Sequence, residues 1–328
     1  MAAIVTKLDP PTTVRIVELP DLPAGGDIAD WIAPEGPMEC REPEEVVAAI
    51  EDLAARTAPW RPKRAGCPTA IVRTAAETPN REVVWLWPGR FPRGKVSLLI
   101  GHPGQGKSLL AVDMAAHVST GRPWPDGKPC VDGQVVILSG EDDSGDTIKP
   151  RLRAAGAELQ RVSIVDGVEY RDAAAGTAKF DLIRLDEHLD VIRDVVVDTQ
   201  ARLLIVDPIS SFVGRVDDHK NAELRRLLAG LAKMAGDCDC AVVAVSHLRK
   251  AGGLAVHQAV GSLAYVAAAR SAWALLRDPD DHERRLLLPV KNNLSRDATG
   301  MAFSITSVGS GGRIPVVEWE RDPITARA

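Results

Sequence analysis

The stretch Val96-Ser-Leu-Leu-Ile-Gly-His-Pro-Gly-Gln-Gly-Lys-Ser-Leu-Leu110 decides the fold. Its first five residues form an apolar run of strand length, and residues 101–108 fit the pattern G-x-x-x-x-G-K-S at every defined position. A helical stretch begins at Leu109. In a strand, glycine loop and helix N-terminus of this kind, backbone N–H groups and the helix dipole favour a polyphosphate. The sequence therefore predicts a nucleoside triphosphate site.

Each residue type in this loop has an expected role. We expect Lys107 to reach the terminal phosphates of ATP and the Ser108 hydroxyl to hold Mg²⁺. The alternative is a glycine-rich turn that happens to carry a lysine, and the intact motif between a strand and a helix argues against it. The expected nucleotide contacts are Gly101, Pro103, Gly104, Gln105, Gly106, Lys107, Ser108 and Leu109.

Composition limits the other functions that this chain can have. A chain of 328 residues with 45% hydrophobic content can form one large α/β domain and a smaller appendage. The net charge of −5 gives no global attraction for nucleic acid or for an acidic membrane, so any contact with nucleic acid needs a local basic patch. Five cysteines without zinc spacing, no signal-peptide pattern and no apolar stretch of about 18 residues predict a cytoplasmic protein with reduced thiols.

The chain divides into three parts. Residues 1–62 are predicted to form a small N-terminal appendage with an amphipathic helix over 43–56, and residues 63–82 a linker rich in helix breakers. Residues 83–328 have the pattern of an α/β domain. Continuous apolar runs predict a mostly parallel sheet with both faces covered. The strands are expected at 96–100, 134–139, 202–206 and 241–246, the helices at 107–119, 145–156, 184–199 and 220–235, and antiparallel edge strands at 272–276, 285–290, 301–307 and 314–319.

Two acidic residues follow predicted strands and are candidates for catalysis. Asp207 ends the strand at 202–206, at the edge where open α/β sheets bind ligands, and could hold Mg²⁺ through its water shell. Glu141 follows the strand at 134–139. If that strand lies beside the phosphate-loop strand, Glu141 would face the γ-phosphate and polarise the attacking water. The alternatives are a turn or helix-cap role for Asp207 and a surface turn for Glu141, while Asp142 and Asp143 are expected to cap the next helix.

Three further residues are candidates for sensing the nucleotide or stabilising the transition state. His247 closes the strand at 241–246 and could sense the γ-phosphate, although a histidine in this place is often a structural residue. Arg270 follows an apolar helical stretch and could act as an arginine finger on a neighbouring subunit. It could equally be a structural ion-pair partner, and Lys291 competes for the finger role.

Taken together, these motifs resemble the RecA-like ATPases of the replicative-helicase group, in particular hexameric plasmid RepA-type helicases and related phage and prophage AAA-type ATPases. The resemblance covers about residues 86–320. It implies that Glu141 is the catalytic base, Asp207 binds the Mg²⁺ water shell, His247 is the γ-phosphate sensor and Arg270 is a finger supplied in trans. The segments that carry it are 86–95, 138–143, the strand ending at Asp207, 246–250, and Gly261-Ser262 with Arg270.

The sequence departs from this group in two places. Ser246 stands where RepA-type helicases have the first of two paired histidines, and Lys291-Asn-Asn293 lacks the arginine of a lysine-x-arginine motif. At the N-terminus, residues 14–19 and 26–32 resemble the closing strand and helix of a Toprim-type primase domain. An amphipathic start with an exposed Trp31 is the alternative. The acidic metal cluster of a primase is absent, so we expect no primase activity.

The function that we expect is an ATP-hydrolysing motor on single-stranded DNA, a replicative helicase of RepA type that works with Mg²⁺ as an oligomeric ring. The expected partners are further copies of the chain in a homo-oligomer, with a hexamer as the expected form, and a primase or another replication protein; no membrane is expected. The alternative is a regulatory or recombination ATPase of the KaiC or RadA kind without unwinding activity. A small-molecule P-loop kinase and a nucleotide-dependent scaffold are less favoured. The expected DNA contacts are Arg215, Lys220, Arg249 and Lys250.

Overall fold

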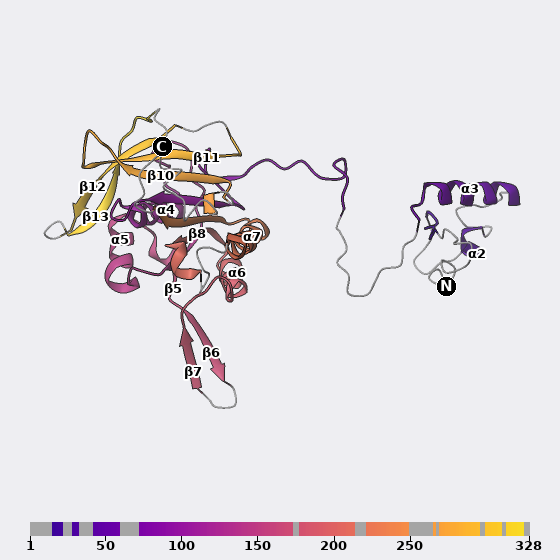
Figure 1. The fold of residues 1–328 in the computed structure, drawn as a ribbon, viewed down its shortest axis with the longest axis horizontal. Coiled ribbons are helices and arrows are strands. Elements are labelled where there is room, and N and C mark those ends of the chain that lie inside the picture. The colour runs from indigo at the N-terminus through magenta and orange to yellow at the C-terminus, as the bar shows by residue number, and fades with distance from the viewer. Residues whose placement is uncertain are drawn as a thin grey trace. The chain divides into compact units, whose positions relative to one another are not determined.

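The computed structural model describes residues 15–21, 28–32, 42–59, 72–172, 177–213, 221–248, 265–266, 269–295, 299–309 and 313–324. The chain forms two compact units, Met1–Asn80 and Arg81–Ala328 (Figure 1). Within the described ranges, no helix is long and apolar enough to cross a lipid bilayer.

Among the described residues of the N-terminal unit are two helices, α2 (Ile28–Trp31) and α3 (Pro43–Arg56). Helix α3 has the bounds that its sequence pattern predicts. Residues 15–19 form no strand, so the strand expected at 14–19 is wrong for its described part. Trp31 is 2% exposed, and its Nε1 donates to the carbonyl of Pro20 at 3.0 Å. The expectation of an exposed Trp31 is therefore also wrong, because this indole finds both packing and a hydrogen-bond partner inside its own unit.

The larger unit is built on a nine-stranded sheet in the order β13-β12-β11-β10-β3-β9-β8-β4-β5. The six strands from β10 to β5 are parallel to their neighbours, and β11, β12 and β13 continue the sheet as antiparallel strands. The strands are β3 (Val96–Gly101), β4 (Gln134–Ser139), β5 (Val162–Val165), β8 (Ala201–Asp207), β9 (Ala241–His247), β10 (Ser271–Arg277), β11 (Arg284–Asn292), β12 (Met301–Val308) and β13 (Ile314–Trp319).

This sheet confirms the predicted fold class, a mostly parallel α/β sheet with antiparallel strands at its C-terminal edge. One detail differs. The segment predicted as the first antiparallel edge strand, now β10, pairs in parallel with β3. Its side chains Trp273, Ala274 and Leu275 are fully buried, so β10 is an inner strand covered on both faces.

Helices cover both faces of the sheet (Figure 1). One face packs against α4 (Lys107–Thr120) and α5 (Lys149–Ala154), and the other against α6 (Leu189–Asp198) and α7 (Asn221–Asp237). Successive strand residues point to opposite faces, so Leu98 and Ile100 join the α6–α7 core while Leu99 joins the α4 core. This double burial explains why the central strands have continuous apolar sequences.

Two regions differ from the sequence prediction. The helix expected at 145–156 is split into a π-helical turn over Ser144–Ile148 and the short α5, which begins just before Pro150. Residues 168–181 hold a hairpin that was not predicted, formed by β6 (Val168–Asp172) and β7 (Thr177–Asp181). The hairpin projects from the body of the unit between β5 and α6 (Figure 1). A short hairpin of β1 (Trp85–Trp87) and β2 (Phe91–Pro92) precedes β3.

Candidate nucleotide-binding site

The phosphate-binding loop leaves the carboxyl end of β3 and enters α4, as the motif predicts. Its three glycines are required by the backbone and by their neighbours. A Cβ on Gly101 would lie 2.5 Å from the carbonyl oxygen of Leu275 on β10. Gly104 has a φ of 75°, and Gly106, which caps α4, has a φ of 93°. These positive φ values suit glycine, so the loop can keep its shape only with these residue types.

Lys107 lies inside this loop. Its side chain is 4% exposed, and Nζ donates to the carbonyl oxygens of Gly101 and His102, each at 2.9 Å. Burial lowers the pKa of Lys107 to about 8, although the nearby carboxylates of Asp207 and Glu141 act in the opposite direction. The ammonium group is therefore poorly solvated, and a phosphate would supply the counter-charge that the carbonyls supply only in part.

Ser108 and Asp207 form the oxygen pair that the sequence predicts for Mg²⁺. The Ser108 hydroxyl donates a hydrogen bond to the Asp207 carboxylate, and both residues line a cavity of about 20 Å³. Burial raises the pKa of Asp207, against the effects of the Ser108 hydrogen bond and the Lys107 charge. A hydroxyl and a carboxylate are the hard oxygen ligands that Mg²⁺ prefers.

Glu141 reaches the site by a different route from the one expected. Glu141 was expected to face the γ-phosphate if its strand lay beside the phosphate-loop strand, and this condition is not met, because β9 and β8 lie between β3 and β4. The chain instead turns across the end of β8 at Gly140, whose N–H donates to the carbonyl of Asp207 at 2.9 Å. A Cβ on Gly140 would lie 2.4 Å from the Cβ of Ser211, so the turn needs a glycine.

The segment around Glu141 is fixed on both sides. The carboxylate of Asp142 pairs with Arg151 of α5 at 2.7 Å, and its backbone N–H and carbonyl both bond to the Ser139 hydroxyl. Asp143 accepts hydrogen bonds from the N–H groups of residues 145 and 146. The predicted capping role is thus confirmed for Asp143, whereas Asp142 anchors the loop to α5.

His247 ends β9 beside the phosphate loop, because β9 pairs with β3 in parallel and Gly101 is its register partner. Its Nε2 lies 3.6 Å from Oε1 of Glu141. Its Nδ1 is buried and has no hydrogen-bond partner among the described residues. The structure therefore brings together the residues proposed as base and as sensor, although two strands, β9 and β8, lie between β3 and β4 in the sheet order.

Arg270 and Lys291 lie at the other edge of the sheet. The N–H of Arg270 donates to the carbonyl of Val96, the first residue of β3, whereas the phosphate loop follows its last residue. The two ends of β3 are roughly 17 Å apart. Lys291 pairs with Ala272 at the same edge, and its Nζ donates to the carbonyl of Val266 at 3.0 Å. Neither side chain can therefore reach the phosphate loop of its own chain.

Three residues at the site were not predicted from the sequence. Ile305 of β12 supports the loop from outside, since a Cβ on Gly106 would lie 2.8 Å from its Cδ1. Arg277 ends β10 at the edge that carries the phosphate loop. Arg151 holds Asp142. No local pattern indicates these contacts, because each depends on strand order or helix packing. The four expected DNA contacts, Arg215, Lys220, Arg249 and Lys250, and the segment Gly261-Ser262 lie outside the described residues.

The strand, loop and helix around Lys107, with Asp207 at the end of a parallel strand, define the class of P-loop nucleotide-binding proteins. The sequence places the chain more narrowly. It belongs to the AAA domain family, whose sequence model matches residues 61–253, more than half of its length. The crystal structure of a KaiC-like protein from the hyperthermophilic archaeon Pyrococcus horikoshii OT3 is also similar, with 20% identity, a TM-score of 0.48, and coverage of 73% of this chain and 100% of that chain.

Proposed function

We propose that this chain hydrolyses ATP with Glu141 as the general base. The observation that carries the proposal is the convergence of Glu141, His247, Lys107 and Asp207 at one edge of the sheet. Glu141 is 59% exposed at this edge, 3.6 Å from His247, and is close enough to Lys107 to affect its pKa. A carboxylate in this place can accept a proton from an attacking water.

Each residue of the loop has a task in this proposal. The backbone N–H groups around Gly104 and Gly106 bind the phosphates, and Lys107 exchanges its two carbonyl partners for phosphate oxygens. Ser108 and Asp207 would hold Mg²⁺, which would supply positive charge to neutralise the phosphates. The contact between His247 Nε2 and Glu141 Oε1, at 3.6 Å, links the proposed sensor to the proposed base.

We further propose that the active enzyme is an oligomer, with a hexameric ring as the expected form. Arg270 is exposed, and its side chain makes no ion pair or hydrogen bond with the described residues. Because it lies at the edge opposite its own phosphate loop, it can serve a nucleotide only on a neighbouring copy. Lys291, which lies at the same edge, is the second candidate for this role.

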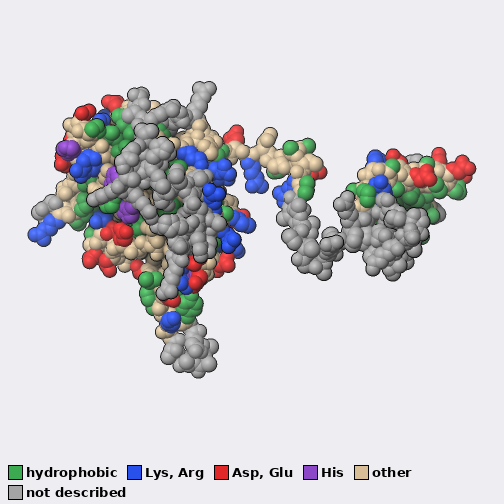
Figure 2. All heavy atoms as spheres, in the orientation of Figure 1, with side chains coloured by type: hydrophobic (Ala, Val, Ile, Leu, Met, Phe, Trp, Pro, Cys, Tyr) green, Lys and Arg blue, Asp and Glu red, His purple; other side chains and the backbone are tan. Residues whose placement is uncertain are grey.

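The expected substrate for movement is single-stranded DNA, as for a replicative helicase of RepA type. In support, Arg215 and Lys220 follow β8, and Arg249 and Lys250 follow β9, whose carboxyl ends lie at the nucleotide edge. Acidic and basic side chains both occur on the face of the larger unit drawn in Figure 2, and neither sign covers it. A local basic loop is thus the expected contact, and a primase or another replication protein would be the partner.

The test measures ATP turnover with and without single-stranded DNA, and the unwinding of a forked duplex. Arg270→Ala is expected to bind ATP and fail to hydrolyse it, and mixing it with Glu141→Gln protein should restore part of the activity if sites are shared between copies. Arg226→Ala is the matched control, because Arg226 is an exposed arginine on α7 that has no assigned role in the site.

The outcomes separate the parts of the proposal. Normal turnover by Glu141→Gln would remove the assigned base. If the mixture of Arg270→Ala and Glu141→Gln protein recovers no ATP turnover, the proposal that two copies share an active site would be refuted. DNA-stimulated turnover without unwinding would favour the regulatory or recombination ATPase of the KaiC or RadA kind over a helicase.

A further inference from the structure

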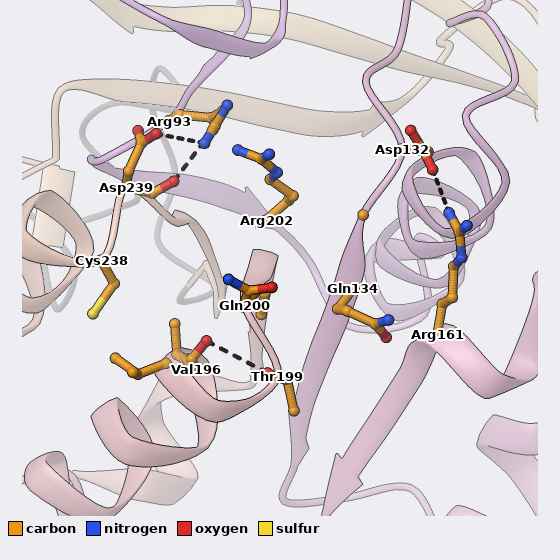
Figure 3. Close-up of a pocket in the computed structure, with 13 residues that line it drawn as sticks. Arg93, Asp132, Gln134, Arg161, Val196, Thr199, Gln200, Arg202, Cys238 and Asp239 are labelled. Carbon is orange, nitrogen blue, oxygen red and sulfur yellow. Dashed lines mark hydrogen bonds and ion pairs between the residues drawn. The ribbon is translucent and has the colours of Figure 1, made fainter.

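A second site lies at the amino edge of the sheet, opposite the phosphate loop. A pocket of about 540 Å³ opens there between the first residues of β4 and β8 and the ends of α6 and α7 (Figure 3). Its walls combine charged, amide and apolar side chains. The residues that the argument uses are Arg93, Asp132, Gln134, Arg161, Arg202 and Asp239.

The charges in this pocket do not balance. Arg93 pairs with Asp239, and its Nε also donates to the Asp239 carbonyl at 3.2 Å. Arg161 pairs with Asp132. Arg202 has neither an ion pair nor a hydrogen bond with the described residues. Both carboxylates of the pocket are therefore already paired, and Arg202, whose positive charge helps to lower the pKa of Asp132, has no carboxylate of the described residues within ion-pair distance.

The stem of Arg202 is held in a fixed place. It lies across the backbone of Gly133, where a Cβ would be 2.1 Å from the Arg202 Cγ and 2.9 Å from its Cβ. Glycine is thus the residue that allows Arg202 to lie here. An arginine whose stem is packed loses less side-chain entropy when its head group binds a ligand.

Arg93 lies in the turn after β2 and Arg202 on β8, and they present their guanidinium groups at the same end of the pocket (Figure 3). Burial lowers the pKa of Arg93; Asp239 acts against this effect, and the positive charge of Arg202 adds to it. Two guanidinium groups this close repel each other, and an anion that bridges them removes the repulsion.

We propose that this pocket binds a small phosphorylated molecule, with its phosphoryl group between Arg93 and Arg202. A carboxylate is satisfied by one arginine, as Asp239 is by Arg93, whereas the three terminal oxygens of a phosphate can meet two guanidinium groups at once. The body of the ligand lies toward Gln134 and Gln200. Helix α6 ends there, and its terminal carbonyls favour hydroxyl donors over further negative charge. The ligand class is therefore a hydroxyl-bearing phosphate monoester.

This site is separate from the ATP site. Strand β8 carries Arg202 near its first residue and Asp207 at its last, so the two sites are roughly 17 Å apart along it. Binding of a ligand in this pocket does not require ATP hydrolysis at the phosphate loop, so the two proposals can be tested separately.

The test is calorimetric titration of the full chain with ribose 5-phosphate, with the nucleotide site saturated by Mg²⁺ and a non-hydrolysable ATP analogue. One binding site is expected. Arg202→Gln should weaken the affinity by about ten- to a hundredfold, since a hydrogen bond to a charged group is lost. Gly133→Ala keeps every charge but displaces the Arg202 stem, so it should weaken binding as well. Arg226→Gln removes an arginine far from the pocket and should bind as the unchanged chain does.

Each outcome decides the proposal, provided that thermal melting shows the variants to be folded. No binding of ribose 5-phosphate at millimolar concentration, or equal affinities for Arg202→Gln and Arg226→Gln, would overturn it. If unphosphorylated ribose binds with equal affinity, the phosphoryl group does not contribute to binding and the proposed contact with Arg93 and Arg202 would be refuted. Arg202-dependent binding of single-stranded DNA in place of ribose 5-phosphate would show that the phosphate comes from a nucleic acid and would refute the small ligand.

Discussion

Raising the pH should weaken ATP binding through one residue, Lys107. Its pKa is about 8 in the free chain because it is buried. Bound phosphates favour the charged ammonium and move the pKa back above its ordinary range. ATP therefore binds best below pH 8, and above that pH each binding event must take up a proton. Between about pH 7 and about pH 9.5 the affinity should fall roughly thirtyfold, since the protonated fraction of the free lysine falls by that factor.

Calorimetry in buffers with different ionisation enthalpies measures this proton directly. The expected uptake is about 0.1 proton per ATP near pH 7 and about 0.9 near pH 9. Burial raises the pKa values of Cys130 and Cys240 to about 12, so these thiols do not titrate in this range. An affinity that stays constant to pH 9.5, with no proton uptake, would contradict the burial argument for Lys107.

Three other substitutions test the geometry of the site. Glu141→Gln should bind ATP normally while turnover falls by about 10²- to 10⁴-fold, measured by phosphate release; near-normal turnover would exclude it as the base. Gly106→Ala should destabilise the fold by about 1–2 kcal/mol through its positive φ alone, measured by thermal melting. Adding Ile305→Ala should relieve only the clash between the new Cβ and the Ile305 side chain. Full recovery of stability in the double variant would show that the backbone strain is negligible. Arg151→Gln frees Asp142 and should lower the turnover number more than the ATP affinity, whereas an equal loss of both would indicate general unfolding.

The local parts of the ATP site could be predicted from the sequence. The loop from Gly101 to Ser108 depends on backbone conformations and side-chain types that are consecutive in the chain. Asp207 and His247 were predicted because each directly follows a buried strand, and parallel strands end at the same edge. The capping role of Asp143 also needs only a few neighbouring residues.

The position of Glu141 could not be predicted in the same way. Strand order depends on which apolar faces pack together, and no local pattern records that β9 and β8 lie between β3 and β4. Glu141 was expected near the phosphate loop on the condition that its strand lies beside β3, and the strand order does not provide this adjacency. It is the turn at Gly140, across the end of β8, that places Glu141 beside His247.

By itself the sequence determined the strand periodicity, the α/β class and the phosphate loop, because these depend on residues close together in the chain. Only the tertiary structure decided that Arg270 and Lys291 lie at the edge opposite their own phosphate loop, and that Arg93 and Arg202 meet in one pocket. Both facts depend on the register of strands far apart in sequence, which is set by burying side chains on two faces at once.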